Sequence, residues 1–157
     1  EILISGPNVM IGYLNDEEKT SKVLKIINSK IYYITGDKGN IDEDGFLTIV
    51  DRYSRFAKLA GEMISLGIIE EKISKLIDLE ENNLVDFIIT TIEDDKKGEK
   101  IILLISHVNE EYISLLKEKI LNSFENKLMI PSNIKIIDEV PRLGSGKKDF
   151  AKAKLLV

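Results

Sequence analysis

The spacing of apolar residues differs between the two parts of this chain. Before about Ser54, short apolar runs rich in β-branched and aromatic residues are separated by polar turns, which is typical of β-strands. Strands are expected at residues 2–4, 30–34 and 46–50. The polar residues 42–45, which end in a glycine, predict a hairpin or meander between the last two strands.

Helical spacing is rare in the first part and frequent in the second. Acidic residues open one helical stretch over 16–24, which suits the positive end of a helix dipole. From Leu66 onward helices and strands alternate. In order, we expect a helix at 66–77, a strand at 85–92, a charged turn at 93–100, a strand at 101–107, a helix at 110–124, a strand at 133–137, a loop at 139–145 and a helix at 150–156.

The long helix expected at 110–124 should pack one face on a sheet. Its apolar residues recur at helical spacing: Ile113, Leu116, Ile120, Leu121 and Phe124. With the alternating strands, this pattern predicts a small α+β domain that has a core of its own.

Composition excludes several classes of protein. The 157 residues contain no cysteine and one histidine, His107, so we expect no disulfide framework, no thiolate or histidine-cluster metal site, and a reducing compartment. No metal ligand is expected among these residues. His107 is expected to be structural or exposed. No apolar run approaches the roughly 18 residues of a membrane helix, and the first residues lack the basic start of a signal peptide, so we expect a soluble segment.

The net charge of −5 argues against a nucleic-acid partner. The lysines are nevertheless concentrated near the C-terminus, at Lys147, Lys148, Lys152 and Lys154. This cluster is either a solvated helix face or a surface that faces phosphate.

Three motifs together suggest parts of a nucleotide site. Residues 33–37 (Tyr-Ile-Thr-Gly-Asp) place a carboxylate after a Thr-Gly turn, residues 51–52 (Asp-Arg) close the next strand, and residues 145–147 (Ser-Gly-Lys) place a lysine in a glycine-flanked loop. With the stretches 6–13, 42–47, 58–62 and 141–147, in this order and spacing, the chain resembles the ATP-dependent adenylate-forming enzymes. These include acyl-CoA synthetases, peptide-synthetase adenylation domains and luciferases.

The resemblance implies a domain organisation. Residues 1–53 would be the β-rich end of a large N-terminal domain, and residues 54–157 the small mobile α+β C-terminal domain. Residues 55–66 and 143–150 look closest to the acyl-[acyl-carrier-protein] synthetase part of bifunctional 2-acylglycerophosphoethanolamine acyltransferases. The chain would then be a piece of a larger enzyme of fatty acid and phospholipid metabolism, whose phosphate loop and acyl pocket lie upstream.

Asp37 is the first nucleotide-binding residue that the resemblance implies, together with Tyr33 and Thr35. One carboxylate can accept hydrogen bonds from two neighbouring ribose hydroxyls. The alternative is that Asp37 caps the turn made with Gly36 and Gly39.

Arg52 is the second expected nucleotide contact, because a guanidinium presents a planar fork of donors to ribose and phosphate oxygens. The alternative is a pair with Asp51, which stands where the family usually has glycine. Ser54 occupies the position of the family's hinge, which is usually aspartate or lysine. A hinge needs only to absorb a change in φ and ψ, so a small residue is acceptable.

Two further loops are expected to carry the chemistry. Lys58, Gly61 and Glu62 resemble the loop that lines the tunnel for a phosphopantetheine thiol, with a Lys58–Glu62 surface salt bridge as the alternative. Lys147 resembles the catalytic lysine of adenylation, whose charge would offset charge that develops between the acyl carboxylate and the α-phosphate. Its glycine-flanked loop is expected to be mobile. Lys148 is the competitor, and the family's Ser-Gly-Lys order favours Lys147.

The function implied is an AMP-forming ligase. It would activate a carboxylic acid, a fatty acid in the favoured reading, with ATP and Mg²⁺. The acyl group would then pass to acyl carrier protein, or to coenzyme A, in the cytoplasm or at the cytoplasmic face of a membrane. The rivals are an acyl-CoA synthetase or peptide-synthetase adenylation domain and, in another class, a non-catalytic module that binds a nucleotide or carrier protein.

Overall fold

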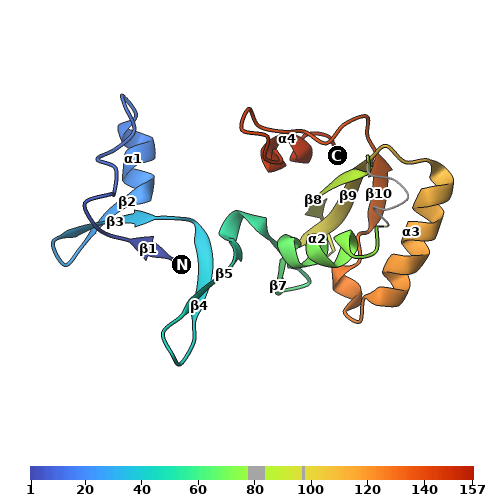
Figure 1. Cartoon of the computed structure of the whole chain (residues 1–157), viewed down its shortest axis with the longest axis horizontal. Helices are drawn as coiled ribbons and strands as arrows, with labels where there is room; N and C mark the ends of the chain where they lie inside the picture. The colour runs from blue at the N-terminus through green and yellow to red at the C-terminus, as the bar shows by residue number, and fades with distance from the viewer. Residues whose placement is uncertain (78–83, 97) are drawn as a thin grey trace. The chain divides into compact units, whose positions relative to one another are not determined.

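A computed structural model describes residues 1–77, 84–96 and 98–157 (Figure 1). Backbone contacts divide the chain into two compact units, Glu1–Arg55 and Phe56–Val157, and each is described by itself. The boundary expected at Ser54 lies in the 3₁₀ turn η1 (Tyr53–Arg55), at the end of the first unit. Strands and helices are mixed along the chain, so the expected α+β class is confirmed.

The first unit contains two antiparallel sheets and one helix. The three-stranded sheet has the order β1–β3–β2, and β4 pairs only with β5. The bounds are β1 (Leu3–Ile4), α1 (Glu17–Val23), β2 (Leu24–Ile27), β3 (Lys30–Ile34), β4 (Asp37–Ile41) and β5 (Leu47–Arg52). Helix α1 starts where the acidic residues predicted it, because the Asp16 carboxylate accepts the Lys19 N–H at 2.9 Å.

The hairpin or meander expected to join strands 30–34 and 46–50 is wrong, because residues 46–50 belong to a strand with a different partner. β5 pairs with β4, whereas β3 lies between β1 and β2. The predicted turn is correct, since the Asp42 carboxylate accepts the N–H groups of Asp44 (3.1 Å) and Phe46 (2.8 Å) and closes the β4–β5 hairpin. Strand β4 escaped prediction because its sequence, Asp-Lys-Gly-Asn-Ile, has a bulge at the glycine and one apolar residue.

No residue of Glu1–Arg55 is buried. Large apolar side chains of this unit are instead highly exposed: Ile11 at 100%, Leu14 at 90%, Ile26 at 77% and Phe46 at 71%. The strands expected in this part of the chain are present, and they form no buried core of their own.

The second unit is built on one five-stranded sheet. Strand β9 pairs antiparallel with β8 over its length, antiparallel with β6 at Gly98, and parallel with β10; β6 also pairs with β7. The strands are β6 (Phe56–Leu59), β7 (Glu62–Ser65), β8 (Asp86–Asp94), β9 (Gly98–Ser106) and β10 (Asn133–Ile136). The helices are α2 (Leu66–Ser74), α3 (Glu110–Ser123), α4 (Phe150–Lys154) and the 3₁₀ turn η2 (Lys127–Met129).

Both faces of this sheet are covered. Alternate residues of β8 and β9 enter two clusters, one with α2 and α3 and the other with α4. The first cluster includes Ile69, Ile73, Ile89, Leu103, Ile105, Ile113, Leu116, Ile120 and Phe124. The second includes Ile88, Ile102, Leu104, Val140 and Ala153. Burial on both faces explains why β8 and β9 read as nearly continuous apolar runs.

Several boundaries in the second unit differ from expectation. Strands β6 and β7 were not predicted, and α2 ends at Ser74 rather than at 77. The charged turn is shorter than 93–100, because β8 runs to Asp94 and β9 starts at Gly98; Lys97, which falls within the expected turn, lies outside the described residues. The expected face of α3 is correct except at Leu121, which is 54% exposed. None of the helices in the described ranges has the length and apolar character needed to span a membrane.

Candidate functional site

Asp37 and Arg52 lie together at one end of the β4–β5 hairpin. They are opposite each other in the strand register, and Arg52 Nε donates a hydrogen bond to Asp37 Oδ1 at 3.2 Å. The Asp37 side chain is 24% exposed and that of Arg52 is 68% exposed. A carboxylate and a guanidinium, separated by 15 residues of sequence, therefore form one polar surface.

The turn before Asp37 is held by Thr35 rather than by the Asp37 carboxylate. The Thr35 hydroxyl accepts the Asp37 N–H at 3.0 Å and donates to the Ile2 carbonyl at 2.9 Å. Gly36 has φ +76°, which favours glycine, and its carbonyl accepts the Tyr53 N–H at 2.8 Å. The geometry therefore differs from the alternative in which Asp37 caps the turn, and its carboxylate pairs with Arg52 instead.

The other residues predicted around this site have more local positions. Asp51 Oδ1 accepts the backbone N–H of Arg52 at 2.8 Å, while the Arg52 guanidinium pairs with Asp37. Tyr33 is half-buried in β3, opposite Ile4 of β1. Ser54 is exposed in η1, and its hinge role stays a prediction.

Lys58, Gly61 and Glu62 lie on the β6–β7 hairpin. Its two-residue turn has φ +51° at Ala60 and +91° at Gly61, the geometry of the tight turns that suit antiparallel hairpins. Leu59 is opposite Glu62 in the register, so Lys58 and Glu62 belong to opposite faces. Among the described residues no ion pair joins these two side chains, so the alternative salt bridge is wrong.

Glu99 fixes this hairpin and was not identified from sequence. Its Oε2 accepts the Lys58 N–H at 2.7 Å, and its Oε1 accepts the Thr91 hydroxyl at 2.7 Å. This carboxylate lies on β9, 41 residues from Lys58 in sequence, and it thereby joins β6 to β8. No local motif signals such a contact.

The loop that carries Lys147 is a hairpin closed by backbone hydrogen bonds. The Leu143 N–H donates to the Lys147 carbonyl and the Gly146 N–H to the Leu143 carbonyl, both at 2.8 Å. Gly146 has φ +82°, and Arg142 pairs with Lys148 as an isolated antiparallel bridge. The backbone of Lys147 is held, while its side chain is exposed and its ammonium contacts no polar group of the described residues.

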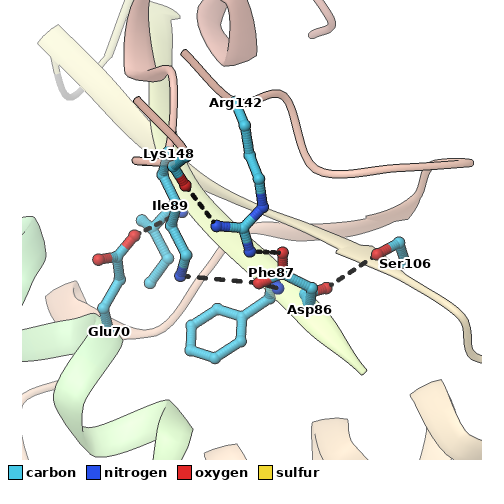
Figure 2. Close-up of polar contacts among 8 residues, drawn as sticks. Glu70, Asp86, Phe87, Ile89, Ser106, Arg142 and Lys148 are labelled. Atoms are coloured by element: carbon cyan, nitrogen blue, oxygen red, sulfur yellow. Dashed lines mark hydrogen bonds and ion pairs between the residues drawn. The ribbon is translucent and has the colours of Figure 1, made fainter. Parts of the chain in front are cut away.

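The adjacent Lys148 has a different environment (Figure 2). Its Nζ lies 4.5 Å from the centroid of the Phe87 ring and 4.0 Å from Asp86 Oδ1, and its side chain is 26% exposed. Of these two neighbouring lysines, Lys147 is therefore the one whose ammonium has no polar partner among the described residues, and its catalytic role stays a prediction.

Comparison with known proteins places this geometry in a family. No protein-family model matches the chain. The 2-succinylbenzoate–CoA ligase of Listeria innocua is 31% identical over 154 residues, which cover 98% of this chain and 31% of that protein. The 4-coumarate–CoA ligase 2 of Nicotiana tabacum is 30% identical over 161 residues, covering 99% of this chain and 28% of that protein.

A solved structure agrees in fold. The o-succinylbenzoate CoA synthetase of Bacillus subtilis, in complex with the acyl-adenylate intermediate, aligns over 98% of this chain and 30% of its own, with a TM-score of 0.73 and 26% identity. The chain belongs to the adenylate-forming, acyl-CoA synthetase-like superfamily. The superfamily predicted from the sequence motifs is thus confirmed, and the α+β architecture matches the superfamily's C-terminal domain.

The chain spans about a third or less of the length of the curated relatives that it matches.

The structure brings Thr35, Asp37 and Arg52 together in the first unit. It places the Lys58–Glu62 hairpin and the Lys147 hairpin in the second unit. Among the described residues there is no group of three or more acidic, histidine or cysteine side chains that could hold a metal ion. His107 is exposed directly after β9.

A cavity of about 650 Å³ in the second unit contains none of the predicted site residues. It is lined by residues 135–142, Lys152 and Leu156. Its walls carry both acidic and basic side chains, so charge does not favour one kind of ligand.

Proposed function

We propose that this chain is the C-terminal portion of an ATP-dependent ligase that joins a carboxylic acid to AMP and then passes the acyl group to a phosphopantetheine thiol. The observation that carries the proposal is Lys147. Its ammonium has no polar partner in the described parts of the chain, and its backbone is held by a hydrogen-bonded hairpin. A fixed backbone with an uncommitted charge suits a group that must meet a developing negative charge.

In the first half-reaction a carboxylate oxygen attacks the α-phosphorus of ATP and pyrophosphate leaves. The role proposed for Lys147 is to neutralise charge between the carboxylate and the α-phosphate as the new bond forms. Mg²⁺, when bound with ATP, supplies further neutralisation of the phosphates.

Asp37 and Arg52 fit the ribose in this proposal. The Asp37 carboxylate accepts hydrogen bonds from vicinal hydroxyls, and the neighbouring guanidinium donates to ribose or phosphate oxygens. Their cross-strand pairing at 3.2 Å supports the assignment, because a ligand could contact both groups at once.

In the second half-reaction the thiol loses its proton to solvent and its sulfur attacks the acyl carbonyl. The bond between the carbonyl carbon and the phosphate oxygen breaks, and AMP leaves. The β6–β7 hairpin is the proposed contact for the phosphopantetheine arm, because Gly61 has no side chain. Apart from its two chain neighbours, no heavy atom of the described residues lies within 4 Å of where a Cβ would stand. Ser54 is the proposed hinge that changes the presented face of the second unit between the two steps.

Two acceptors carry the same arm. The resemblance of residues 55–66 favours acyl carrier protein, with a fatty acid as substrate and a fused lysophospholipid acyltransferase at the cytoplasmic face of a membrane. The names of the relatives favour coenzyme A. Thioester formation with each acceptor, measured in parallel on the whole protein, distinguishes them.

The test is Lys147→Ala in the whole protein that contains this chain. We expect acid-dependent exchange between ATP and pyrophosphate to slow roughly 100- to 1000-fold, while thioester formation from a preformed adenylate changes little. Lys152→Ala, which removes an exposed lysine of α4, is the matched control. Equal losses in both half-reactions would contradict the assignment of Lys147 to adenylation. A wild-type protein that binds nucleotide without any exchange would instead support the non-catalytic module.

A further inference from the structure

The Lys147 hairpin is tied to the sheet by one arginine. Arg142 Nη1 donates to the Gly146 carbonyl at 2.8 Å, and its Nη2 forms a short, charge-assisted hydrogen bond with Asp86 Oδ2 (Figure 2). Asp86 is the first residue of β8 and lies 56 residues from Arg142 in sequence. The guanidinium therefore connects the peptide immediately before Lys147 with the start of a strand in the core.

The position of the Asp86 carboxylate is itself well determined. Its Oδ1 accepts the Phe87 N–H at 2.9 Å and lies 4.0 Å from Lys148 Nζ, on the other strand of the Lys147 hairpin. The Asp86 carbonyl accepts the hydroxyl of buried Ser106 at 3.3 Å (Figure 2). One carboxylate thus contacts the cationic side chains of both residues that pair at the base of the hairpin.

We propose that Asp86 is a positioning residue for Lys147. Through Arg142 it fixes the Gly146 peptide, and so the direction in which the Lys147 side chain leaves the hairpin. This inference rests on the proposed function of Lys147 in adenylation.

The effect on rate should exceed the effect on stability. The Asp86 and Arg142 side chains are 27% and 46% exposed, and ion pairs with that access to water contribute little to folding. Displacement of a catalytic group by about 1 Å, in contrast, can cost on the order of 100-fold in rate. A residue that positions Lys147 should therefore reveal itself in kinetics before it does so in thermal melts.

The experiment is Asp86→Asn in the whole protein. Asparagine keeps the size and can still accept the Phe87 N–H, but it loses the charge that holds Arg142. We expect ATP–pyrophosphate exchange to slow about 10- to 100-fold, with thioester formation from preformed adenylate unchanged and partial recovery in Asp86→Glu. Asp94→Asn is the matched control, because Asp94 ends the same strand, is 25% exposed and lies 3.9 Å from Lys100.

Combination with Lys147→Ala separates positioning from general damage. If Asp86 acts through Lys147, Asp86→Asn should slow exchange no further once Lys147 is alanine, since the two changes remove the same contribution. Multiplied losses in the double variant would overturn the proposal, as would an Asp86→Asn rate equal to that of Asp94→Asn.

Amide hydrogen exchange at Leu143 and Gly146 gives a second readout, and unchanged protection of these two amides in Asp86→Asn would also overturn the proposal. If the wild type showed no exchange between ATP and pyrophosphate, the proposed function would fail first and the positioning role with it.

Discussion

Replacement of Asp37 by asparagine separates nucleotide binding from turn stability. Asparagine keeps the size of the side chain and removes its charge. In the structure the turn at residues 35–37 is held by the Thr35 hydroxyl, at 3.0 Å from the Asp37 nitrogen, so the carboxylate is not needed to form it. The charge should therefore matter for a ligand more than for the fold.

The expected magnitudes follow from exposure and from charge. The Asp37–Arg52 pair has 24% and 68% exposed side chains, and exposed ion pairs stabilise proteins by about 0 to 1 kcal/mol. Hydrogen bonds to a charged group are worth roughly 1.5 to 3 kcal/mol, which corresponds to about 10- to 100-fold in affinity. Asp37→Asn should therefore weaken binding of ATP or adenylate by that factor, while the free energy of unfolding falls by less than about 1 kcal/mol.

The assay is nucleotide titration and thermal melting of the whole protein. Asp42→Ala is the opposite control, since Asp42 accepts two backbone N–H groups in the turn of the same hairpin. It should lower stability by about 1 kcal/mol and leave nucleotide affinity unchanged. The reasoning is refuted if Asp37→Asn destabilises the protein as Asp42→Ala does while it retains nucleotide affinity.

Two predictions concern the second unit. Gly61→Ala should destabilise by about 1 to 2 kcal/mol in chemical denaturation, because φ is +91° at an otherwise open position; an unchanged midpoint would show that the turn readjusts. A hydrogen bond from Lys75 at 2.6 Å, followed by the charge of Lys75, lowers the pKa of Glu71. The small stability gained from this pair is present above the unfolded pKa of Glu71 and is lost as the pH falls through the folded value. Carboxyl NMR titration should show that the pKa of Glu71 returns toward its ordinary value in Lys75→Met, and a pKa that stays low would exclude Lys75 as the cause.

The sequence predicted elements whose apolar pattern is long or whose caps are local. β8, β9 and α3 were recognisable because buried residues recur along them, and α3 begins at Asn109, whose side chain accepts the Tyr112 N–H. β4 and β7 were missed because they have only five and four residues, and a run that contains Gly39 or directly follows Gly61 carries too little pattern. The partner of β5 was mispredicted, because the nearest apolar run before it, residues 30–34, is not its neighbour and its true partner β4 has one apolar residue.

In the candidate site, too, residues that stand in local motifs were predictable and residues that act through long-range contacts were not. Asp37, Arg52 and Lys147 stand in short motifs, so a resemblance could locate them. Glu99 and Asp86 act through contacts that span 41 and 56 residues, and each is an ordinary acidic residue near a strand end. Nothing in the local sequence distinguishes such a carboxylate from an exposed one, because its importance arises only when the strands assemble.

The absence of buried residues in Glu1–Arg55 has a consequence for how this chain acquires its order. Removal of apolar surface from water is the main favourable term that offsets the entropy lost on folding. The second unit provides that term from its own two clusters, so its strands can open and close as one cooperative group. The first unit must draw its cooperativity from surfaces beyond its own strands. The hairpin that bears Asp37 and Arg52 would then be ordered by whatever covers its exposed apolar side chains. The geometry of the proposed ribose site would depend on that contact.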